Sequence, residues 1–140
     1  MTKPNPRRAA FDVWADYYDL TDTDRGPFVA FYRRLSTERT RSLSSSAAGT
    51  GTIAIARTDD LARRDGLRVV GIDQWPWMLR LARERAKELD WVLGDLRSPA
   101  VEGPFDLVIC CFSTLQLVRA RGVVRSAAAI FRERRATASC

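Results

Sequence analysis

The chain has 140 residues, of which 46% are hydrophobic and 29% are charged. This length and balance are typical of one folded domain, and they exclude a disordered, a collagen-like or a multi-domain protein. The sequence contains no histidine, which is the commonest general base and the commonest metal ligand. A Ser-His-Asp hydrolase is therefore excluded, and we expect no metal site.

The sequence carries no signal for a membrane span or for secretion. Its longest apolar stretch, Leu107 to Val118, includes three polar residues and is shorter than the roughly 20 residues that a membrane span needs. The charged N-terminus is not followed by the apolar segment of a secretory signal. Of the three cysteines, Cys110 and Cys111 are adjacent in a predicted strand, which gives neither a disulfide framework nor zinc spacing. We therefore expect a cytoplasmic protein.

The net charge of +6 is concentrated near the end of the chain. Residues 119–140 contain six arginines and one acidic residue, and the apolar positions within 122–135 recur with helical spacing. This pattern predicts a basic amphipathic helix followed by a tail. Because a basic helix face is more often solvated than bound, and only Phe131 interleaves with the arginines, we do not expect nucleic-acid binding.

In chain order, the pattern begins with two helices and then alternates. Residues 9–18 and 27–35 have helical spacing, and Pro27 suits a first helical position. The elements expected after them are a helix over 52–64, a strand over 67–73, a helix over 76–89, a strand over 91–93 and a strand over 105–112. A continuous apolar run such as the last is typical of a parallel strand that is buried on both faces. We predict an α/β fold, with a Rossmann-like parallel sheet flanked by helices.

The place of the first strand is taken by a patch of serine and alanine, residues 42–48. These residue types are poor strand formers, so the patch conflicts with the alternation around it. It is followed by Gly49-Thr50-Gly51, and glycines at this position can form a tight turn from strand to helix. Such a turn lets backbone N–H groups approach a ligand.

Four features then occur in a fixed order: the Gly49-Thr50-Gly51 turn, Asp73 at the end of the second strand, Gly94-Asp95 at the end of the third, and the apolar strand over 105–112. This ordered set, within residues 11–118, resembles class I S-adenosylmethionine-dependent methyltransferases. The resemblance implies S-adenosyl-L-methionine as cofactor and methyl transfer to a small-molecule acceptor. It divides the chain into an N-terminal helical cover (1–40), a cofactor-binding core (41–118) and the basic helix with its tail (119–140).

The resemblance also implies a set of cofactor contacts, because ligands of open parallel sheets bind outside the carboxyl ends of the strands. Asp73 would accept hydrogen bonds from the ribose hydroxyls, and Asp95 would accept one from the adenine amino group. The implied contacts are Tyr18, Gly49, Gly51, Asp73, Gln74, Asp95, Leu96 and Cys111. A catalytic base is not identified.

Each of these residues has a structural alternative. Asp73 and Asp95 are also ordinary strand-end turn formers. Tyr17 or Tyr18 would equally serve core packing, and the two adjacent cysteines would be small buried hydrophobic residues.

The sequence departs from the family pattern in three places. Ser45 and Ala47 stand where the family has an acidic residue and a further glycine, and Trp75 and Trp77 stand where it has a polar helix cap and an acid. We hypothesise that local frame disturbances produced residues 42–48 and 119–140. The last strands of the family fold are not found, which would leave the strand over 105–112 as an exposed edge for a homodimer.

Two other functions remain open at this stage. A methyltransferase-like domain without catalytic activity would act in protein interaction. An NAD-binding domain is the other alternative, because Gly49 to Ala54 fits a Gly-x-Gly-x-x-Ala fingerprint and Asp73 follows 19 residues after Ala54.

Overall fold

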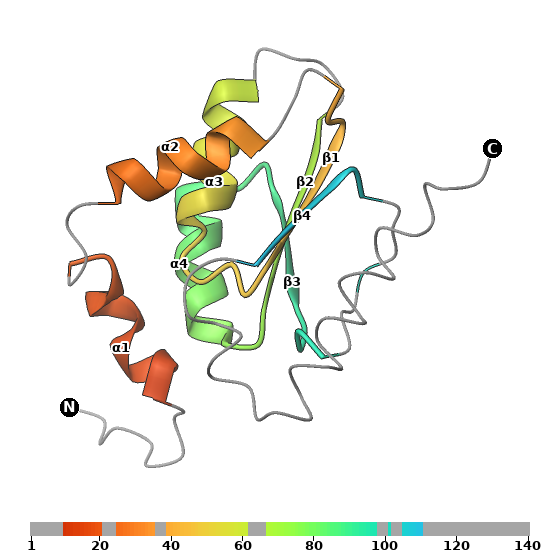
Figure 1. Cartoon of the computed structure of the whole chain (residues 1–140). Coiled ribbons are helices and arrows are strands. Elements are labelled where there is room, and N and C mark those ends of the chain that lie inside the picture. The colour runs from red at the N-terminus through yellow and green to blue at the C-terminus, as the bar shows by residue number, and fades with distance from the viewer. Residues whose placement is uncertain are drawn as a thin grey trace.

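The structure is a computed structural model that describes residues 10–20, 25–35, 39–61, 67–97, 101 and 105–110. Its elements are α1 (Ala10–Tyr18), α2 (Gly26–Leu35), β1 (Ser42–Ser46), α3 (Thr52–Leu61), β2 (Arg68–Asp73), α4 (Pro76–Arg85), β3 (Asp90–Leu93) and β4 (Leu107–Cys110). Figure 1 shows the described helices gathered on one side of the sheet. The predicted basic helix over 122–135 and Cys111 lie outside the described residues.

The four described strands form one parallel sheet in the order β3-β2-β1-β4. Its register pairs Ser46 with Ile72 and Asp73 with Leu93, so the carboxyl ends of β1, β2 and β3 lie side by side. The backbone N–H of Gly94 donates to the carbonyl of Asp73 at 2.9 Å and ties the third of these ends to the second. The parallel α/β sheet predicted from the sequence is confirmed, and it brings Gly49, Asp73 and Gly94 to one edge.

The core is divided by the sheet into two apolar clusters. On the helix side, Leu43, Val69 and Trp91 pack with residues of α3 and α4. Val70, Ile72 and Phe105 form a second cluster, against which Val92 and Val108 also pack. Because successive residues of a strand point to opposite faces, β2, β3 and β4 contribute to both clusters, whereas β1 contributes Leu43 to the first alone.

The serine patch does form the strand that the alternation requires. Backbone pairing with β2 on one side and β4 on the other holds β1 in place. Ser44 and Ser46 are buried, and their hydroxyl oxygens have no hydrogen-bond partner among the described residues. A buried hydroxyl without a partner costs about 1–3 kcal/mol. Tertiary pairing therefore overrides a composition that is unfavourable both for a strand and for a core.

One helix is shorter than the sequence predicts. Helix α4 ends at Arg85 rather than at residue 89. The cause is Ala86, whose backbone is extended (φ −146°) and whose carbonyl accepts a hydrogen bond from the Trp91 indole at 2.8 Å. This bond brings the chain directly back into β3.

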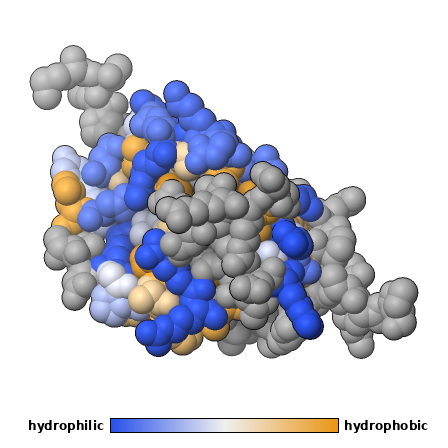
Figure 2. Space-filling view, turned by 90° about the horizontal axis from the view of Figure 1, so that it is seen from above, coloured by the Kyte–Doolittle hydropathy of each residue, from blue (hydrophilic) through white to orange (hydrophobic). Residues whose placement is uncertain are grey.

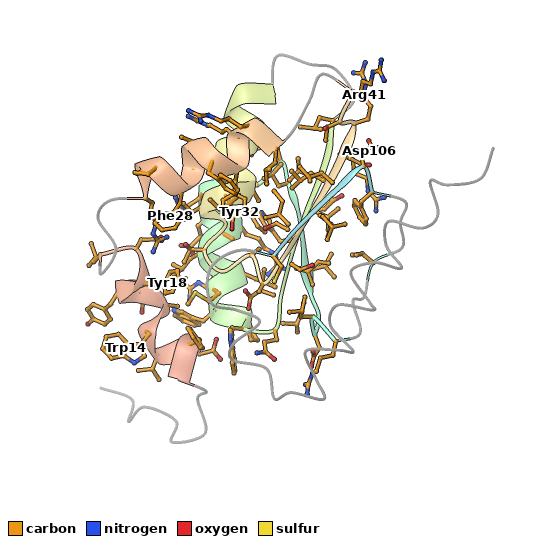
Figure 3. All side chains as sticks on the ribbon, viewed as in Figure 1. Trp14, Tyr18, Phe28, Tyr32, Arg41 and Asp106 are labelled. Carbon is orange, nitrogen blue, oxygen red and sulfur yellow. The ribbon has the colours of Figure 1, made fainter. Side chains whose placement is uncertain are left out.

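The described surface is largely polar. In the view from above, hydrophilic side chains cover most of the visible described surface, with apolar patches between them (Figure 2). Exposed aromatic side chains occur on α1 and α2, where Trp14 points away from the sheet whereas Tyr18 points toward it (Figure 3). Within the described ranges, none of the helices has the length and apolar character needed to cross a bilayer.

Candidate functional site

The turn between β1 and α3 has a backbone that favours glycine at three positions. Ala47, Gly49 and Gly51 all have positive φ angles, of 53°, 57° and 84°. The turn is fixed by hydrogen bonds from the N–H of Ala48 to Ile72 O (2.8 Å) and from the N–H of Gly51 to Ala48 O (3.0 Å). Ala47 is the position at which the sequence lacks the expected further glycine. The structure shows why a glycine belongs there, because residues with a Cβ are strained at positive φ whereas glycine is not.

Asp73 lies beside this turn with its side chain almost fully enclosed. The residue is 5% exposed, and its carboxylate accepts hydrogen bonds from the N–H of Gly49 (2.7 Å) and of Trp75 (2.9 Å). Burial raises the pKa of Asp73 above its ordinary value of 3.8, and the backbone N–H donors oppose that rise. The N–H of Gln74 is a third backbone donor to Asp73, so within the described residues one of about four acceptor positions of this carboxylate is left for an incoming donor.

The two outer glycines of the Gly49-Thr50-Gly51 turn have different surroundings. A Cβ on Gly49 would meet only the Tyr18 ring among the described residues, at 3.8 Å, so that side of the turn is open. A Cβ on Gly51 would lie 2.5 Å from the Trp91 ring. Trp91 also covers Gly71 of β2, where a Cβ would lie 2.2 Å from the ring. Gly51 and Gly71 thus make room for a core indole, which the sequence analysis did not foresee.

The residues predicted at the end of β3 are near the surface. The Asp95 carboxylate accepts hydrogen bonds from the side chain of Arg97, with Nε at 2.8 Å, and from its backbone N–H. These contacts, the side-chain bond above all, hold the pKa of Asp95 below its usual value. Leu96 is half-buried and Gln74 is exposed. The structure therefore places Asp73, Gln74, Asp95 and Leu96 on neighbouring strand ends.

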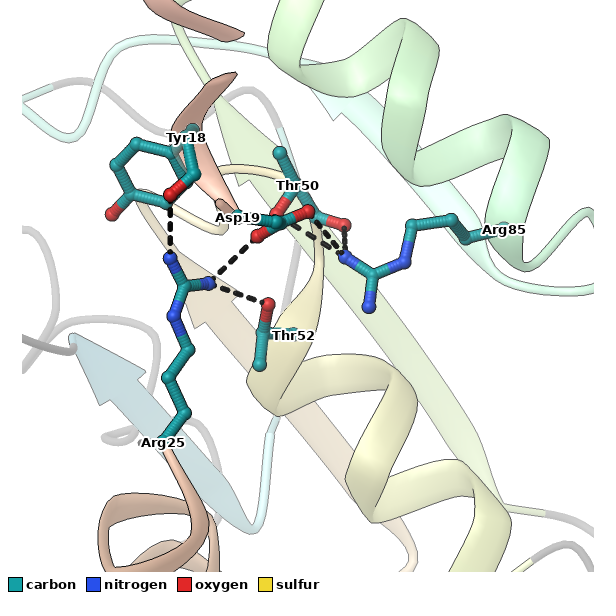
Figure 4. Close-up of polar contacts among 6 residues, drawn as sticks. All are labelled: Tyr18, Asp19, Arg25, Thr50, Thr52 and Arg85. Carbon is teal, nitrogen blue, oxygen red and sulfur yellow. Dashed lines mark hydrogen bonds and ion pairs between the residues drawn. The ribbon is translucent and has the colours of Figure 1, made fainter. Parts of the chain in front are cut away.

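The C-terminal end of α1 lies over the turn, and a cluster of charged and hydroxyl groups connects the two (Figure 4). Asp19 accepts hydrogen bonds from Thr50 Oγ1 (2.8 Å), Arg25 Nη1 (2.8 Å) and Arg85 Nη1 (3.0 Å). Arg85 also donates to the carbonyl of Thr50 at 3.1 Å. Arg25 lies over the Tyr18 ring, 4.8 Å from its centroid. Helix α1 is thereby bound to the turn itself.

Helix α1 also supplies the cap that the sequence of α4 lacks. The N-cap residue of α4, Trp75, makes no side-chain capping bond. Instead, Asp12 of α1 accepts a hydrogen bond from the Trp77 N–H at 3.0 Å. The Trp77 indole donates to Asp16 at 3.0 Å, and the Trp75 ring stacks on Phe11. Both tryptophans therefore have packing roles, and they fix α1 against α4.

Asp19, Arg25 and Arg85, which form the charged cluster over the turn, were not predicted as site residues, because their contacts join distant segments. Asp19 and Arg85 are 66 positions apart, and local spacing cannot pair them. One signal was available: Asp12, Asp16 and Asp19 recur with helical spacing and mark one acidic face of α1. That face is the one that contacts α4 and the turn.

Two other predicted residues have limited roles in the described structure. Tyr17 is exposed, in contrast to the half-buried Tyr18. Burial raises the pKa of the Cys110 thiol to about 11. A thiol of this kind remains protonated near neutral pH and is a poor nucleophile. The described residues contain no cluster of side chains suited to a metal ion.

Comparison with known proteins gives one family and many structural neighbours. Residues 46–134 match the family described as "Methyltransferase domain". No match was found among curated proteins.

Three of the similar solved structures come from Streptoalloteichus, Streptomyces and Micromonospora. The sugar N-methyltransferase KedS8 from Streptoalloteichus sp ATCC 53650 is 19% identical, with a TM-score of 0.72 over 95% of this chain and 52% of its own. DesVI of Streptomyces venezuelae is 25% identical, with a TM-score of 0.70 over 85% of this chain and 52% of its own.

CalS10 from Micromonospora echinaspora, an amino pentose methyltransferase whose structure holds S-adenosylmethionine, is 26% identical, with a TM-score of 0.66 over 84% of this chain and 51% of its own. This chain thus spans about half the length of these three proteins.

Proposed function

Because the chain belongs to the methyltransferase domain family, of the class I S-adenosylmethionine-dependent type, we propose that it binds S-adenosylmethionine at the carboxyl ends of β1, β2 and β3. There it transfers the methyl group to a small-molecule acceptor. The observation that carries the proposal is the buried Asp73 carboxylate, which is hydrogen-bonded to Gly49 of the glycine turn.

The donor and acceptor groups at this edge fit such a cofactor. The Asp73 carboxylate accepts three backbone hydrogen bonds from described residues and keeps an acceptor position that suits a ribose hydroxyl. The open side of Gly49 admits a ligand against the backbone. Asp95, on the neighbouring strand end, is an acceptor for an exocyclic amino group once Arg97 shares or yields its bonds. Under this proposal Gln74 and Leu96 flank the adenosine, Tyr18 covers it and Gly51 shapes the turn, whereas Cys111 lies outside the described residues.

The chemistry that follows is largely a matter of position. When bound, S-adenosylmethionine would supply an electrophilic methyl group: the acceptor's lone pair would form a bond to the methyl carbon in line with the breaking carbon–sulfur bond, S-adenosylhomocysteine would leave, and a methylated amine would release its proton to water. The residues of this chain would hold the nucleoside by Asp73 and keep water away by the α1 cover. Orientation of this kind is worth several orders of magnitude in rate, and it does not require histidine.

The similar structures suggest where to look for the acceptor. Two of them are described as a sugar N-methyltransferase and an amino pentose methyltransferase. We include in the proposal an acceptor with an amine on a small molecule, such as an amino sugar, a cytoplasmic location, and no nucleic-acid partner. We also propose that β4, which ends one side of the described sheet, pairs with a second copy of the chain.

Two alternatives make different predictions. An inactive domain acting in protein interaction would keep the fold, and the strained Ala47 together with the serine-rich β1 favours it. An NAD-binding domain shares the glycine fingerprint, but the family match favours the methyltransferase interpretation.

Calorimetric titration with S-adenosylhomocysteine tests the proposal. We expect saturable binding by the natural chain, and we expect Asp73→Asn to weaken it by about tenfold or more, the loss of a hydrogen bond to a charged group. Asp106→Asn is the matched control, because Asp106 lies at the amino ends of the strands, beside Arg41 and far from Tyr18 (Figure 3). Absence of binding, or an equal loss in both variants, would refute the proposed site.

Methyl transfer separates the enzyme from the inactive domain. The natural chain is incubated with methyl-labelled S-adenosylmethionine and a set of amino sugars. Label appearing in an acceptor, together with S-adenosylhomocysteine in equal amount, supports the enzyme. Binding without any transfer would favour the inactive domain, and saturable NADH binding that S-adenosylhomocysteine does not displace would favour the dinucleotide alternative.

A further inference from the structure

The charged cluster over the glycine turn contains a carboxylate where β1 offers none. Ser45, at the position where the family pattern has an acidic residue, is buried in β1 and has no charge. Asp19 instead reaches the turn from α1, with its carboxylate 2.8 Å from Thr50 Oγ1. Its side chain is 41% exposed, so the carboxylate is open to a ligand that lies on the turn.

The carboxylate of Asp19 retains one acceptor position. Oδ1 accepts from Arg25 and Thr50, whereas Oδ2 accepts only from Arg85 among the described residues. A carboxylate oxygen accepts two hydrogen bonds, so Oδ2 has room for one further donor. That donor would lie beside the turn.

Arg85 retains donors in the same place. Its Nη1 makes all the hydrogen bonds that Arg85 has within the described part of the chain, to Asp19 and Thr50. Nε and Nη2 remain available, and the side chain is 42% exposed. A guanidinium edge of this kind binds a carboxylate with two N–H groups.

Arg25 supports this pair and does not itself face the ligand. Its side chain is 11% exposed and donates to Asp19, Thr52 Oγ1 and the carbonyl of Tyr18. It holds Asp19 in position, and the two arginines leave the cluster with an excess positive charge. A ligand with only an ammonium group would therefore bind weakly here. A ligand with both an ammonium and a carboxylate matches Asp19 and Arg85.

We propose that Asp19 and Arg85 form a clamp for the amino-acid end of the cofactor, a proposal that rests on the function proposed above. Asp19 Oδ2 accepts a hydrogen bond from the ammonium, and the free edge of Arg85 donates to the carboxylate. The ammonium and carboxylate of an α-amino acid are attached to the same carbon and so lie close together. Their two binding groups on the protein are also close, because Asp19 Oδ2 and Arg85 Nη1 are 3.0 Å apart. The clamp supplies from α1 the carboxylate that β1 lacks.

Two ligands separate the clamp from the rest of the site. S-adenosylhomocysteine carries the amino-acid end, and 5′-methylthioadenosine has the same nucleoside and thioether without it. We expect the natural chain to prefer S-adenosylhomocysteine. We expect Asp19→Asn to raise the dissociation constant of S-adenosylhomocysteine by about tenfold and to change that of 5′-methylthioadenosine by less than about twofold. Arg85→Gln is a second variant, with the same expected selectivity.

Asp16→Asn is the matched control, because Asp16 is on the same helix and, among the described residues, its carboxylate is hydrogen-bonded to the Trp77 indole and not to the Asp19 cluster. It should leave the ratio of the two affinities unchanged. Equal weakening of both ligands by Asp19→Asn and Arg85→Gln would overturn the clamp and show a cluster that only fixes α1. A natural chain that binds both ligands equally would overturn the clamp and leave the proposed function intact. A natural chain that binds neither would refute the proposed function and the clamp together.

Discussion

Ala47 offers a test of the backbone conformation on which the site depends. Its φ of 53° lies in the left-handed region, which costs an L-residue about 1–2 kcal/mol. Replacing Ala47 by glycine removes this strain, but it also gives the unfolded chain more freedom, worth about 0.4–1 kcal/mol. The difference predicts that Ala47→Gly raises the free energy of unfolding by about 0.5–1 kcal/mol.

Thermal unfolding followed by circular dichroism measures this effect. A gain of that size should raise the midpoint by about 2–4 °C in a chain of this length. Ala48→Gly is the matched control, because Ala48 is the next residue and is not among those with positive φ. It should lower the midpoint, since glycine there brings its entropic cost and removes a methyl group that packs against the core. A midpoint that falls equally in both variants would refute the left-handed turn.

Three further predictions concern the stability of the fold. Gly71→Ala should destabilise it by about 1–3 kcal/mol, because the new Cβ would lie 2.2 Å from the Trp91 ring. The loss of unfolding free energy, measured by urea unfolding, should be smaller when Trp91 is also replaced by leucine, and an undiminished loss would contradict this reasoning. Asp12→Ala should cost about 1 kcal/mol in the same assay, whereas Asp12→Asn, which keeps an acceptor for the α4 cap, should cost less; equal losses would argue against capping. The backbone N–H groups of Arg41 and Ser42 lower the pKa of Asp106, so its contribution to stability is present above pH 3.8 and is lost as the pH falls further. The stability difference between the natural chain and Asp106→Asn should therefore shrink below pH 3.8, and a constant difference would refute the linkage.

The order of elements was predictable because it depends on local periodicity. The apolar runs that became β2 and β4 and the helical spacing of α1 and α4 indicate these elements without any long-range information. The strand-end positions of Asp73 and Asp95 followed from the same reasoning, since carboxyl ends of parallel strands converge on one edge. Their binding roles stay predictions.

The end of α4 and the role of its cap were not predictable. Helical periodicity continues through residue 89, but the Trp91 indole takes the carbonyl of Ala86 and ends the helix earlier. The sequence has Trp75 in place of a polar helix cap, yet Asp12 provides the acceptor from another helix. In both cases the deciding contact joins a side chain to a backbone group outside its own element, which composition does not encode.

The serine strand shows the opposite case, in which the sequence argued against an element that forms. Ser44 and Ser46 are poor strand residues, and their hydroxyls have no partner within the described part of the chain. Backbone bonds to β2 and β4 nevertheless hold the strand. Register with neighbouring strands can thus compensate for an unsuitable side-chain set, at a cost in stability.

The most direct test of the proposed site is an NMR titration of the ¹⁵N-labelled chain with S-adenosylhomocysteine. The amide signals of Gly49, Gly51, Asp73 and Asp95 should shift together and saturate with one dissociation constant, while those of Arg41 and Asp106 at the opposite edge should stay in place. Saturable shifts at Arg41 and Asp106 that leave Gly49 and Asp73 unchanged, or no saturable shift anywhere, would contradict a cofactor site at the carboxyl ends of β1, β2 and β3.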